Sequence, residues 1–137
     1  MRHWLFKSEP ACWSWADQLA RGEAGEPWDG VRNYAARNHM REMQPGDLGF
    51  FYHSQTERAV VGIAEIIAPA APDPTDPSGT WDCVTLRALE PLPRPVTLRQ
   101  IKADPTLAGM ALVRLTRLSV QPVSAAEWAR VRAMGGL

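Results

Sequence analysis

The chain has 137 residues, of which 45% are hydrophobic and 22% charged, so residues 1–137 are expected to form a single compact domain with an ordinary core. Fifteen basic residues balance fifteen acidic ones, which excludes a protein that attracts a polyanion through its net charge; a nucleic-acid partner would be read locally, one nucleotide at a time. No segment reaches the roughly 20 apolar residues of a membrane span, and the apolar N-terminal stretch is too short for a signal peptide, so we expect a cytoplasmic protein without a membrane partner.

The first third of the chain predicts a strand followed by two helices. Trp4–Lys7 has the composition of a strand, which Pro10 terminates. Ser14 and Asp17 form a capping-box pattern that opens a short helix ending near residue 21. After a loop, Asn33 is expected to cap a second helix that ends near residue 43. Its core face is predicted from helical spacing to consist of Ala36, Met40 and Met43.

The middle of the chain predicts strands. Leu48–His53 and Ala59–Ile67 are expected to pair through the hairpin-length connection between them. Gly62 interrupts the second of these strands and indicates a bulge or the close approach of another group. Trp81–Leu89 alternates apolar and polar side chains and predicts a third strand.

The remaining segments complete an α+β pattern. Ala68–Thr80 contains four prolines and is predicted to be an ordered surface loop. Thr97 caps a short helix, Val113–Val120 is expected to be a strand, and Ser124 caps a last helix that ends at the glycine pair 135–136. Strands in series with helices at both ends of the chain favour a small, mostly antiparallel sheet or barrel.

The segment Trp28–Arg41 is unusually rich in aromatic, Arg and Asn side chains, which suit a planar polar ligand such as a nucleobase. Trp28 is either a stacking wall or a residue that fills the edge of the core, and Tyr34 has the same two interpretations. Asn33 is first of all a helix cap. The basic side chains of the segment either contact phosphates or form a solvated helix face; they are Arg32, Arg37 and Arg41.

Catalytic patterns are weak. His53 and Ser54 are adjacent, so on a strand they point to opposite faces and His53 cannot readily activate Ser54. The chain has no nucleophile elbow, phosphate-binding loop, dinucleotide fingerprint or deaminase signature. Cys12 and Cys83 lack metal-ligand spacing, as do the histidines, so no metal or cofactor is predicted.

Read together, the motifs resemble the EVE domain of the PUA-like superfamily, which also contains the YTH and ASCH domains. The resemblance covers nearly the whole chain in the family's order. It is carried by W-L-F-K-S-E-P at 4–10, G-V-R-N-Y-A-A-R-N at 30–38, G-D-L-G-F-F-Y-H-S at 46–54, V-G-I-A-E-I at 61–66, P-D-P-T at 72–75 and R-L-S-V-Q-P-V at 117–123.

The resemblance implies a PUA-like fold, a compact and mostly antiparallel β-barrel flanked by short helices, and a non-catalytic reader of modified nucleobases. EVE domains are associated with modified cytosines in DNA. By motif position the implied ligand-binding residues are Lys7, Ser8, Glu9, Trp28, Val31, Arg32, Asn33, Tyr34, His53, Ser54, Asp73, Pro74 and Thr75.

Our hypothesis is that a monomeric domain flips one modified base, favoured as a cytosine of DNA, into an aromatic cage that includes Trp28. Arg37 and Arg41 would contact phosphates outside the cage. Two alternatives stay open at this point: a module that binds modified RNA, and a small hydrolase of a nucleoside-like substrate with His53 and Glu9 as acid–base pair. The sequence does not identify a protein partner.

Overall fold

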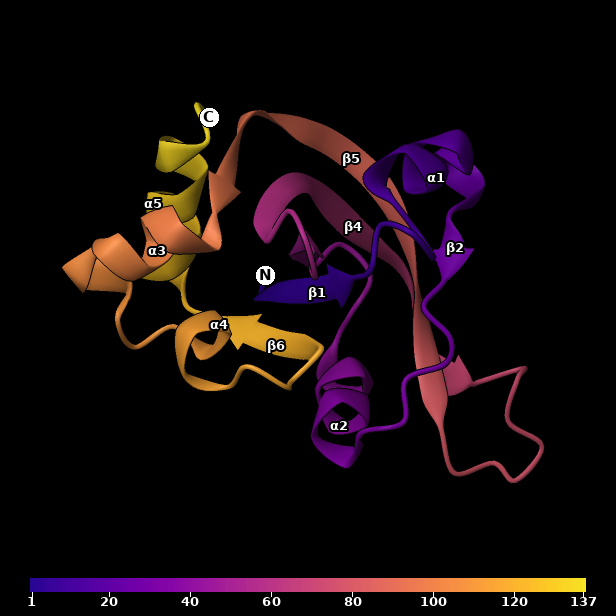
Figure 1. Ribbon diagram of the computed structural model, residues 1–137. Coiled ribbons are helices and arrows are strands. Elements are labelled where there is room, and N and C mark those ends of the chain that lie inside the picture. Colours follow the sequence, from indigo (N-terminus) through magenta and orange to yellow (C-terminus); the bar gives the residue numbers. More distant parts are fainter.

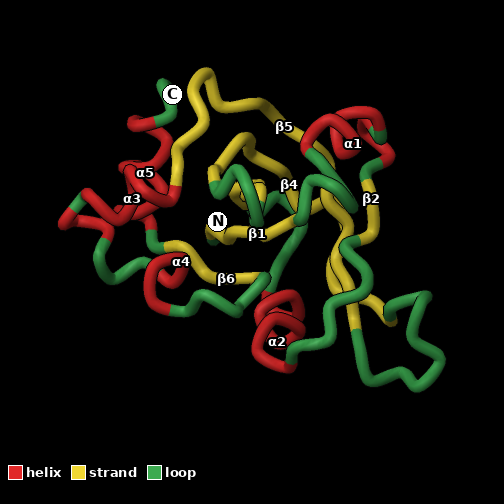
Figure 2. Tube along the Cα trace, viewed as in Figure 1, coloured by secondary structure: helices red, strands yellow, loops and turns green.

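The computed structural model describes residues 1–137 as one curved sheet surrounded by short helices (Figures 1 and 2). The strands are β1 (His3–Ser8), β2 (Glu26–Pro27), β3 (Leu48–His53), β4 (Ala59–Pro72), β5 (Asp82–Thr97) and β6 (Val120–Val123). The α-helices are α1 (Trp15–Ala20), α2 (Tyr34–Glu42), α3 (Leu98–Ala103), α4 (Ala111–Arg114) and α5 (Ala125–Met134), and two 3-10 helices span Gly22–Ala24 and Pro105–Leu107.

The strands form a single mixed sheet in the order β2-β5-β4-β3-β1-β6. β1 pairs with β3 in parallel, and the other neighbouring pairs are antiparallel. The predicted α+β class with a mostly antiparallel sheet is therefore confirmed. The sheet curves like a barrel, but its edge strands β2 and β6 do not pair with each other, so hydrogen bonds do not close it.

Both faces of the sheet are covered, which explains why Trp4–Phe6 of β1 and Phe50–Tyr52 of β3 are consecutive buried apolar or aromatic residues. Trp4 and Phe6 of β1 point into one core, which α1 and α2 cover. Leu5 points into the other core, which α3, α4 and α5 cover. Figure 1 shows these two groups of helices on opposite sides of the sheet. No helix has the length and apolar character needed to span a lipid bilayer.

The predicted helix starts are confirmed because capping is a local interaction. Ser14, Thr97 and Ser124 each form a complete capping box, and the side chain of Asn33 accepts a hydrogen bond from the backbone N–H of Ala36 at 2.9 Å. The helix α2 buries Ala36 and Met40, and Met43 follows as its buried C-cap.

Two strands are longer than predicted. β4 continues to Pro72 and β5 to Thr97, so part of the proline-rich segment 68–80 is strand and only residues 73–81 connect the two. Prolines lack a backbone N–H, but here they occupy exposed positions where the register of the two strands shifts. The prediction of a surface loop across all of 68–80 is thus wrong for its first five residues.

The predicted strand Val113–Val120 is wrong for most of its length. Residues up to Arg114 belong to α4, a turn follows, and strand pairing starts only at Val120, opposite Phe6. The apolar residues of this segment pack as part of α4 and the turn that follows it. The Nε–H of Arg114, the last residue of α4, donates to the carbonyl of Gly109 at 2.8 Å. Gly62 behaves as predicted: a Cβ there would lie 2.5 Å from the ring of Trp15, and the register of β4 shifts beside it.

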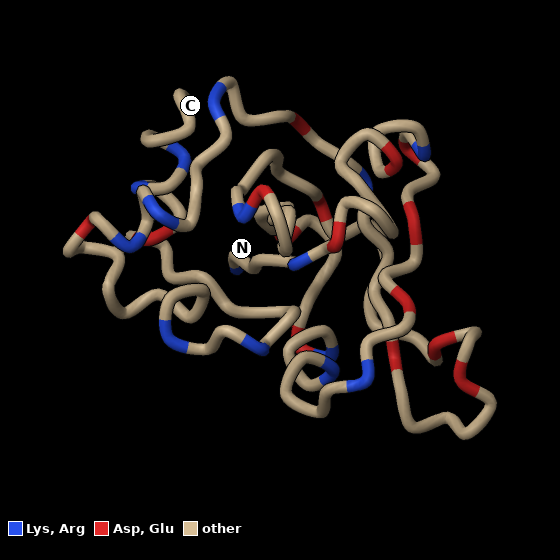
Figure 3. Tube along the Cα trace, viewed as in Figure 1, with Lys and Arg blue, Asp and Glu red and all other residues tan.

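The balanced net charge conceals a separation of charges along the chain. Residues 91–137 contain seven basic and two acidic side chains, whereas residues 1–90 contain eight basic and thirteen acidic ones. In space, Lys and Arg gather around α3, α4 and α5, and Asp and Glu gather around α1, β2 and the loop between β4 and β5 (Figure 3). The side of the domain around α3, α4 and α5 therefore has a positive electrostatic potential, and the side around α1 and β2 has a negative one.

Candidate functional site

A cavity of about 580 Å³ opens at the C-terminal end of β1, beside β2 and the loop that follows it. Its volume lies within the range of about 300–1,000 Å³ that is usual for small-ligand sites. Six of the predicted ligand-binding residues line it: Lys7, Ser8, Glu9, Trp28, Val31 and Arg32. The other lining residues are Cys12, Trp13, Glu26, Pro27, Asp29, Gly30 and Ser119.

Trp28 is both a wall of the cavity and part of the core. Its ring meets Phe6 and Phe51 edge to face, with centroids 5.4 and 5.6 Å apart, and only 9% of the residue is exposed. The backbone N–H of Trp28 donates to the carbonyl of Val84 at 2.8 Å, which attaches the wall to β5. The two sequence interpretations of Trp28 are therefore compatible, since one side of the ring packs and the remainder borders the cavity.

A second indole, Trp13, borders the cavity after β1 ends. The hydroxyl of Ser8 donates to the carbonyl of Trp13, and the indole N–H of Trp13 donates to Gln18 at 2.9 Å. Trp13 is half-buried, so more of its surface is available to a ligand than that of Trp28. These bonds fix the position of the ring relative to the end of β1.

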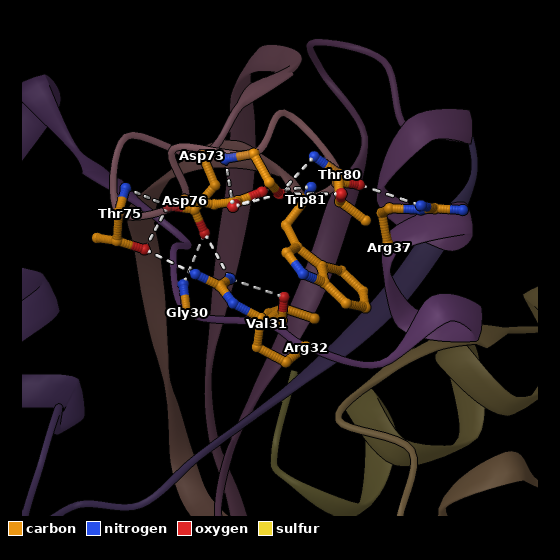
Figure 4. A network of polar contacts seen from close by, with 10 residues as sticks. Gly30, Val31, Arg32, Arg37, Asp73, Thr75, Asp76, Thr80 and Trp81 are labelled. Carbon is orange, nitrogen blue, oxygen red and sulfur yellow. Dashed lines mark hydrogen bonds and ion pairs between the residues drawn. The ribbon is translucent and has the colours of Figure 1, made fainter.

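Asp73 holds the wall formed by residues 30–32 from behind (Figure 4). Its carboxylate accepts hydrogen bonds from the Gly30 N–H at 2.8 Å, from Arg32 Nη1 at 3.1 Å, and from the N–H and hydroxyl of Thr75 at 2.7 and 2.6 Å. Burial acts to raise the pKa of Asp73, but these hydrogen bonds prevail and lower it to about 2. Arg32 also donates to the Thr75 hydroxyl at 3.0 Å, so its guanidinium is committed to the wall.

The loop residues Asp73, Pro74 and Thr75 thus do not line the cavity. Asp73 is buried behind Gly30 and Arg32. The hydroxyl of Thr75 donates to Asp73 and accepts from Arg32, and Pro74 is exposed. Their place in the structure is that of a support for the residues that do line it.

Lys7 lies at the rim, between this cavity and a neighbouring hollow of about 350 Å³. Its ammonium donates to the carbonyl of Thr116 at 2.8 Å, and burial lowers the pKa of the group. Ser54 lines only the second hollow, where its hydroxyl donates to the carbonyl of Ser8 at 3.2 Å.

His53 is buried and both of its ring nitrogens are occupied. Nε2 accepts a hydrogen bond from the backbone N–H of Trp15 at 2.9 Å, which places the ring proton on Nδ1, 2.6 Å from the carboxylate of Glu57. His53 does not line the cavity, whereas Glu9 does. The ring nitrogens of His53 are therefore bonded to Trp15 and Glu57 and not to Glu9, its partner in the hydrolase alternative.

The remaining predicted residues form an outer cluster on α2. Tyr34 is 60% exposed and lies against Trp81, with ring centroids 4.8 Å apart, and the guanidinium of Arg37 sits 4.8 Å from the Tyr34 ring. Arg37 donates to the carbonyl of Thr80 at 3.0 Å, and Arg41 pairs with Asp82 at 2.5 Å. Asn33, Tyr34, Arg37 and Arg41 thus lie outside the cavity, and Asn33 acts as the helix cap.

No group of three or more His, Cys, Asp or Glu side chains is arranged to hold a metal ion. The titratable groups at the cavity are instead spread around its wall. The carboxylates are those of Glu9, Glu26 and Asp29, and the cations are those of Lys7 and Arg32. Such a set offers hydrogen-bond acceptors and donors to an organic ligand.

A sequence profile described as the EVE domain matches residues 2–134. The chain belongs to the EVE domain family. Human thymocyte nuclear protein 1 is 33% identical over 158 residues, which cover 92% of this chain and 70% of that protein. Its crystal structure in complex with 5-methylcytosine-containing DNA is similar to this EVE domain with a TM-score of 0.94, at 31% identity, covering 100% of this chain and 99% of that chain.

Two further structures place the fold. A crystal structure of a protein from Agrobacterium tumefaciens is 54% identical, with a TM-score of 0.99, and covers 100% of this chain and 94% of that chain. An ASCH protein from Zymomonas mobilis reaches a TM-score of 0.61 at 13% identity, covering 98% of this chain and 99% of that chain. The latter likeness shows that the EVE domain shares its α+β fold with an ASCH protein.

Sequence reasoning missed several residues that line the cavity of this EVE domain. Trp13 is the most informative, because it stands in the segment A-C-W-S-W, only three residues after Pro10. The sequence feature that indicates it is an aromatic residue shortly after the end of a strand that already carries the charged residues Lys7 and Glu9. The acidic residues Glu26 and Asp29 flank Trp28 in sequence and were passed over as part of a loop.

Proposed function

We propose that this EVE domain is a non-catalytic module that binds nucleic acid, favoured as DNA, by taking one modified cytosine out of the stack and into the cavity between Trp13 and Trp28. The observation that carries the proposal is the convergence of two indoles, three carboxylates and Lys7 on one site of suitable volume. The complex of human thymocyte nuclear protein 1 with 5-methylcytosine-containing DNA supports it, because that protein has the same fold at 31% identity.

Stacking supplies affinity in this arrangement. A base has two flat faces, and aromatic stacking contributes about 1–3 kcal/mol per base. Trp28 is held rigidly by Phe6 and Phe51, so it presents a fixed surface. Trp13 is fixed through Ser8 and Gln18 and presents the more exposed surface.

Hydrogen bonding supplies the choice of cytosine. Cytosine carries an amino donor at N4, and Asp or Glu side chains accept from it. Glu9, Glu26 and Asp29 offer such acceptors. One of the three N–H groups of the Lys7 ammonium donates to the carbonyl of Thr116, and the other two can donate to the carbonyl oxygen and ring nitrogen on the same edge of the base.

The proposal excludes a role for His53 as general base. Its Nε2 is engaged by a backbone N–H and its Nδ1 by Glu57, so releasing either nitrogen would leave a buried group without a partner. The geometry gives the hydrolase alternative no support, and the RNA alternative is decided by the experiment below.

The deciding experiment is a binding panel of matched oligonucleotides that carry cytosine or 5-methylcytosine, as DNA and as RNA. We expect tighter binding of the methylated DNA by the wild-type domain. Trp13→Ala should weaken that binding by about 5- to 150-fold, the equivalent of about 1–3 kcal/mol, with a smaller effect on the plain oligonucleotide. Leu89→Ala, which removes an exposed apolar side chain of β5 outside the cavity, is the matched control.

Equal affinity for cytosine and 5-methylcytosine in every context would contradict the proposed function. Preference for the modified RNA over the modified DNA would assign the module to RNA instead. Discrimination that survives both Trp13→Ala and Asp29→Asn would show that the base is not bound in this cavity.

A further inference from the structure

A groove of cations adjoins the base cavity on the other side of Lys7. The hollow of about 350 Å³ next to the cavity is lined by Lys7, Arg58 and Lys102 and by no acidic side chain. A further hollow of about 460 Å³ shares Arg58, Leu98 and Lys102 with it and adds Arg99, so the two hollows adjoin; together they are called the groove. The only two lysines of the chain, Lys7 and Lys102, both line this groove.

The cations of the groove are not neutralised within the protein. None of Lys7, Arg58, Arg99 and Lys102 forms an ion pair, whereas Arg32, Arg41 and Arg130 each pair with an aspartate. The one carboxylate at the groove, that of Glu57, is bound to His53 at 2.6 Å. Unpaired cations that share a concave surface create a local positive potential that suits an anion.

The backbone holds Arg58 in place at a conformational cost. Gln55 and Arg58 have backbone φ angles of 70° and 51°, which residues other than glycine rarely adopt. The turn persists because the carbonyl of Arg58 accepts a hydrogen bond from the N–H of Leu98 at 2.8 Å and Arg58 Nε donates to the carbonyl of Gln55 at 3.0 Å. These bonds tie the β3–β4 turn to the start of α3, beside Lys102. Strain of this kind is often stored at functional sites.

We infer that this groove binds the phosphodiester backbone next to the flipped nucleotide, with Arg58, Arg99 and Lys102 contacting phosphates and Lys7 joining backbone and base. The inference rests on the proposed function for the source of the strand. It also explains the charge separation of the domain: the groove lies on the basic side, around α3, and the acidic side around α1 and β2 repels the remainder of the strand (Figure 3). Arg37 donates to the carbonyl of Thr80 and Arg41 pairs with Asp82, so both contribute less to binding the phosphodiester backbone.

The test compares the salt dependence of binding to plain and 5-methylcytosine oligonucleotides between about 50 and 200 mM salt. The variant is Arg58→Asn with Lys102→Gln, because Asn tolerates the left-handed backbone at position 58. Arg2→Gln with Arg94→Gln is the control; it removes the same charge from exposed positions outside the groove. Thermal unfolding of both double variants shows that each is folded.

We expect the groove variant to flatten the slope of log K against log salt by about 1.8, from about 0.9 for each lost phosphate contact, and to weaken plain and modified oligonucleotides by the same factor. An unchanged slope, or a slope that changes equally in the control, overturns the groove. Failure of the proposed function has a different signature: the wild-type domain would then not distinguish the two oligonucleotides, while the slope could still be compared on either of them. No measurable binding of the wild-type domain to any oligonucleotide overturns both.

Discussion

The carboxylate of Asp73, in the first residue after β4, lies 3.1 Å from Nη1 of Arg32, although 41 residues separate the two in sequence. The same carboxylate accepts a hydrogen bond from the Gly30 N–H. The wall of the cavity is therefore a loop cross-linked to the far end of a long strand. Such a loop can present Trp28 and Val31 to a ligand without first being ordered, which favours affinity.

Asp73→Asn should loosen this wall. The Gly30 N–H and Arg32 share Oδ2 of Asp73, whereas Thr75 donates to Oδ1. The amide keeps the size of the carboxylate but loses its charge and one acceptor, so one of these two sets of donors faces an NH2 group that cannot accept a hydrogen bond. We expect the free energy of unfolding to fall by about 1–3 kcal/mol, and the affinity for the modified oligonucleotide to fall as well, as measured by urea denaturation and anisotropy. Asp76→Asn, in the same loop but exposed to solvent to a greater extent, is the control. Unaltered affinity in Asp73→Asn would show that the wall does not depend on this cross-link.

The stability of the domain should fall in acid between about pH 4 and pH 2. Hydrogen bonds outweigh burial and hold the pKa of Asp73 at about 2, and hydrogen bonds from Thr106 and Arg130 lower the pKa of Asp104 to about 2, each from an ordinary value of 3.8. A carboxyl group with a lowered pKa in the folded state stabilises that state above its unfolded pKa, and the contribution is lost as the pH falls through the folded value. Denaturation midpoints measured from pH 5 to about pH 2 should decline less steeply in Asp73→Asn than in the wild-type domain. An identical decline in both would contradict the assignment.

The parts of this fold that the sequence revealed are those set by neighbours in the chain. Capping at Ser14, Thr97 and Ser124 needs only three following residues, and Gly62 stood out within its own strand. The error at Val113–Val120 arose because apolar spacing there is decided by which element the segment packs against.

The residues that line the cavity were predictable only where a family motif indicated that a residue lies at the site. Lys7 and Glu9 lie at the end of β1 and Trp28 directly follows β2, and no local pattern indicates that these two segments share a cavity. Trp13 was missed for the same reason. The use of Arg32 could not be predicted either, because its partner Asp73 depends on how far β4 extends.

His53→Ala should lower stability with little effect on base discrimination. The substitution leaves the buried N–H of Trp15 without an acceptor and removes a ring that meets Phe51 edge to face, which should cost about 1–3 kcal/mol in urea denaturation. Glu57→Gln retains an acceptor for Nδ1–H and should cost less. The ratio of affinities for modified and plain DNA should stay at the wild-type value in both variants. Loss of discrimination in a His53→Ala protein of unimpaired stability would reassign His53 to the ligand site.

Gly62→Ala should destabilise the core beneath the cavity. A Cβ at position 62 would meet the ring of Trp15 at 2.5 Å, and Trp15 is buried against Phe51 with centroids 5.3 Å apart, so the ring cannot simply move away. We expect a loss of about 1–3 kcal/mol in the free energy of unfolding, as is usual for overpacking.

Gly109→Ala provides the control, because a Cβ there meets nothing within 4 Å and its φ lies outside the left-handed range; it should be neutral or slightly stabilising. The steric cause is tested by combining Gly62→Ala with Trp15→Leu, which removes the ring that the new methyl group meets. If the clash is the cause, Gly62→Ala should cost less in the Trp15→Leu background than alone, and the difference in a double-mutant cycle measures the contact. Equal costs in both backgrounds would mean that Gly62 is required for the bulge of β4 and not for the approach of Trp15.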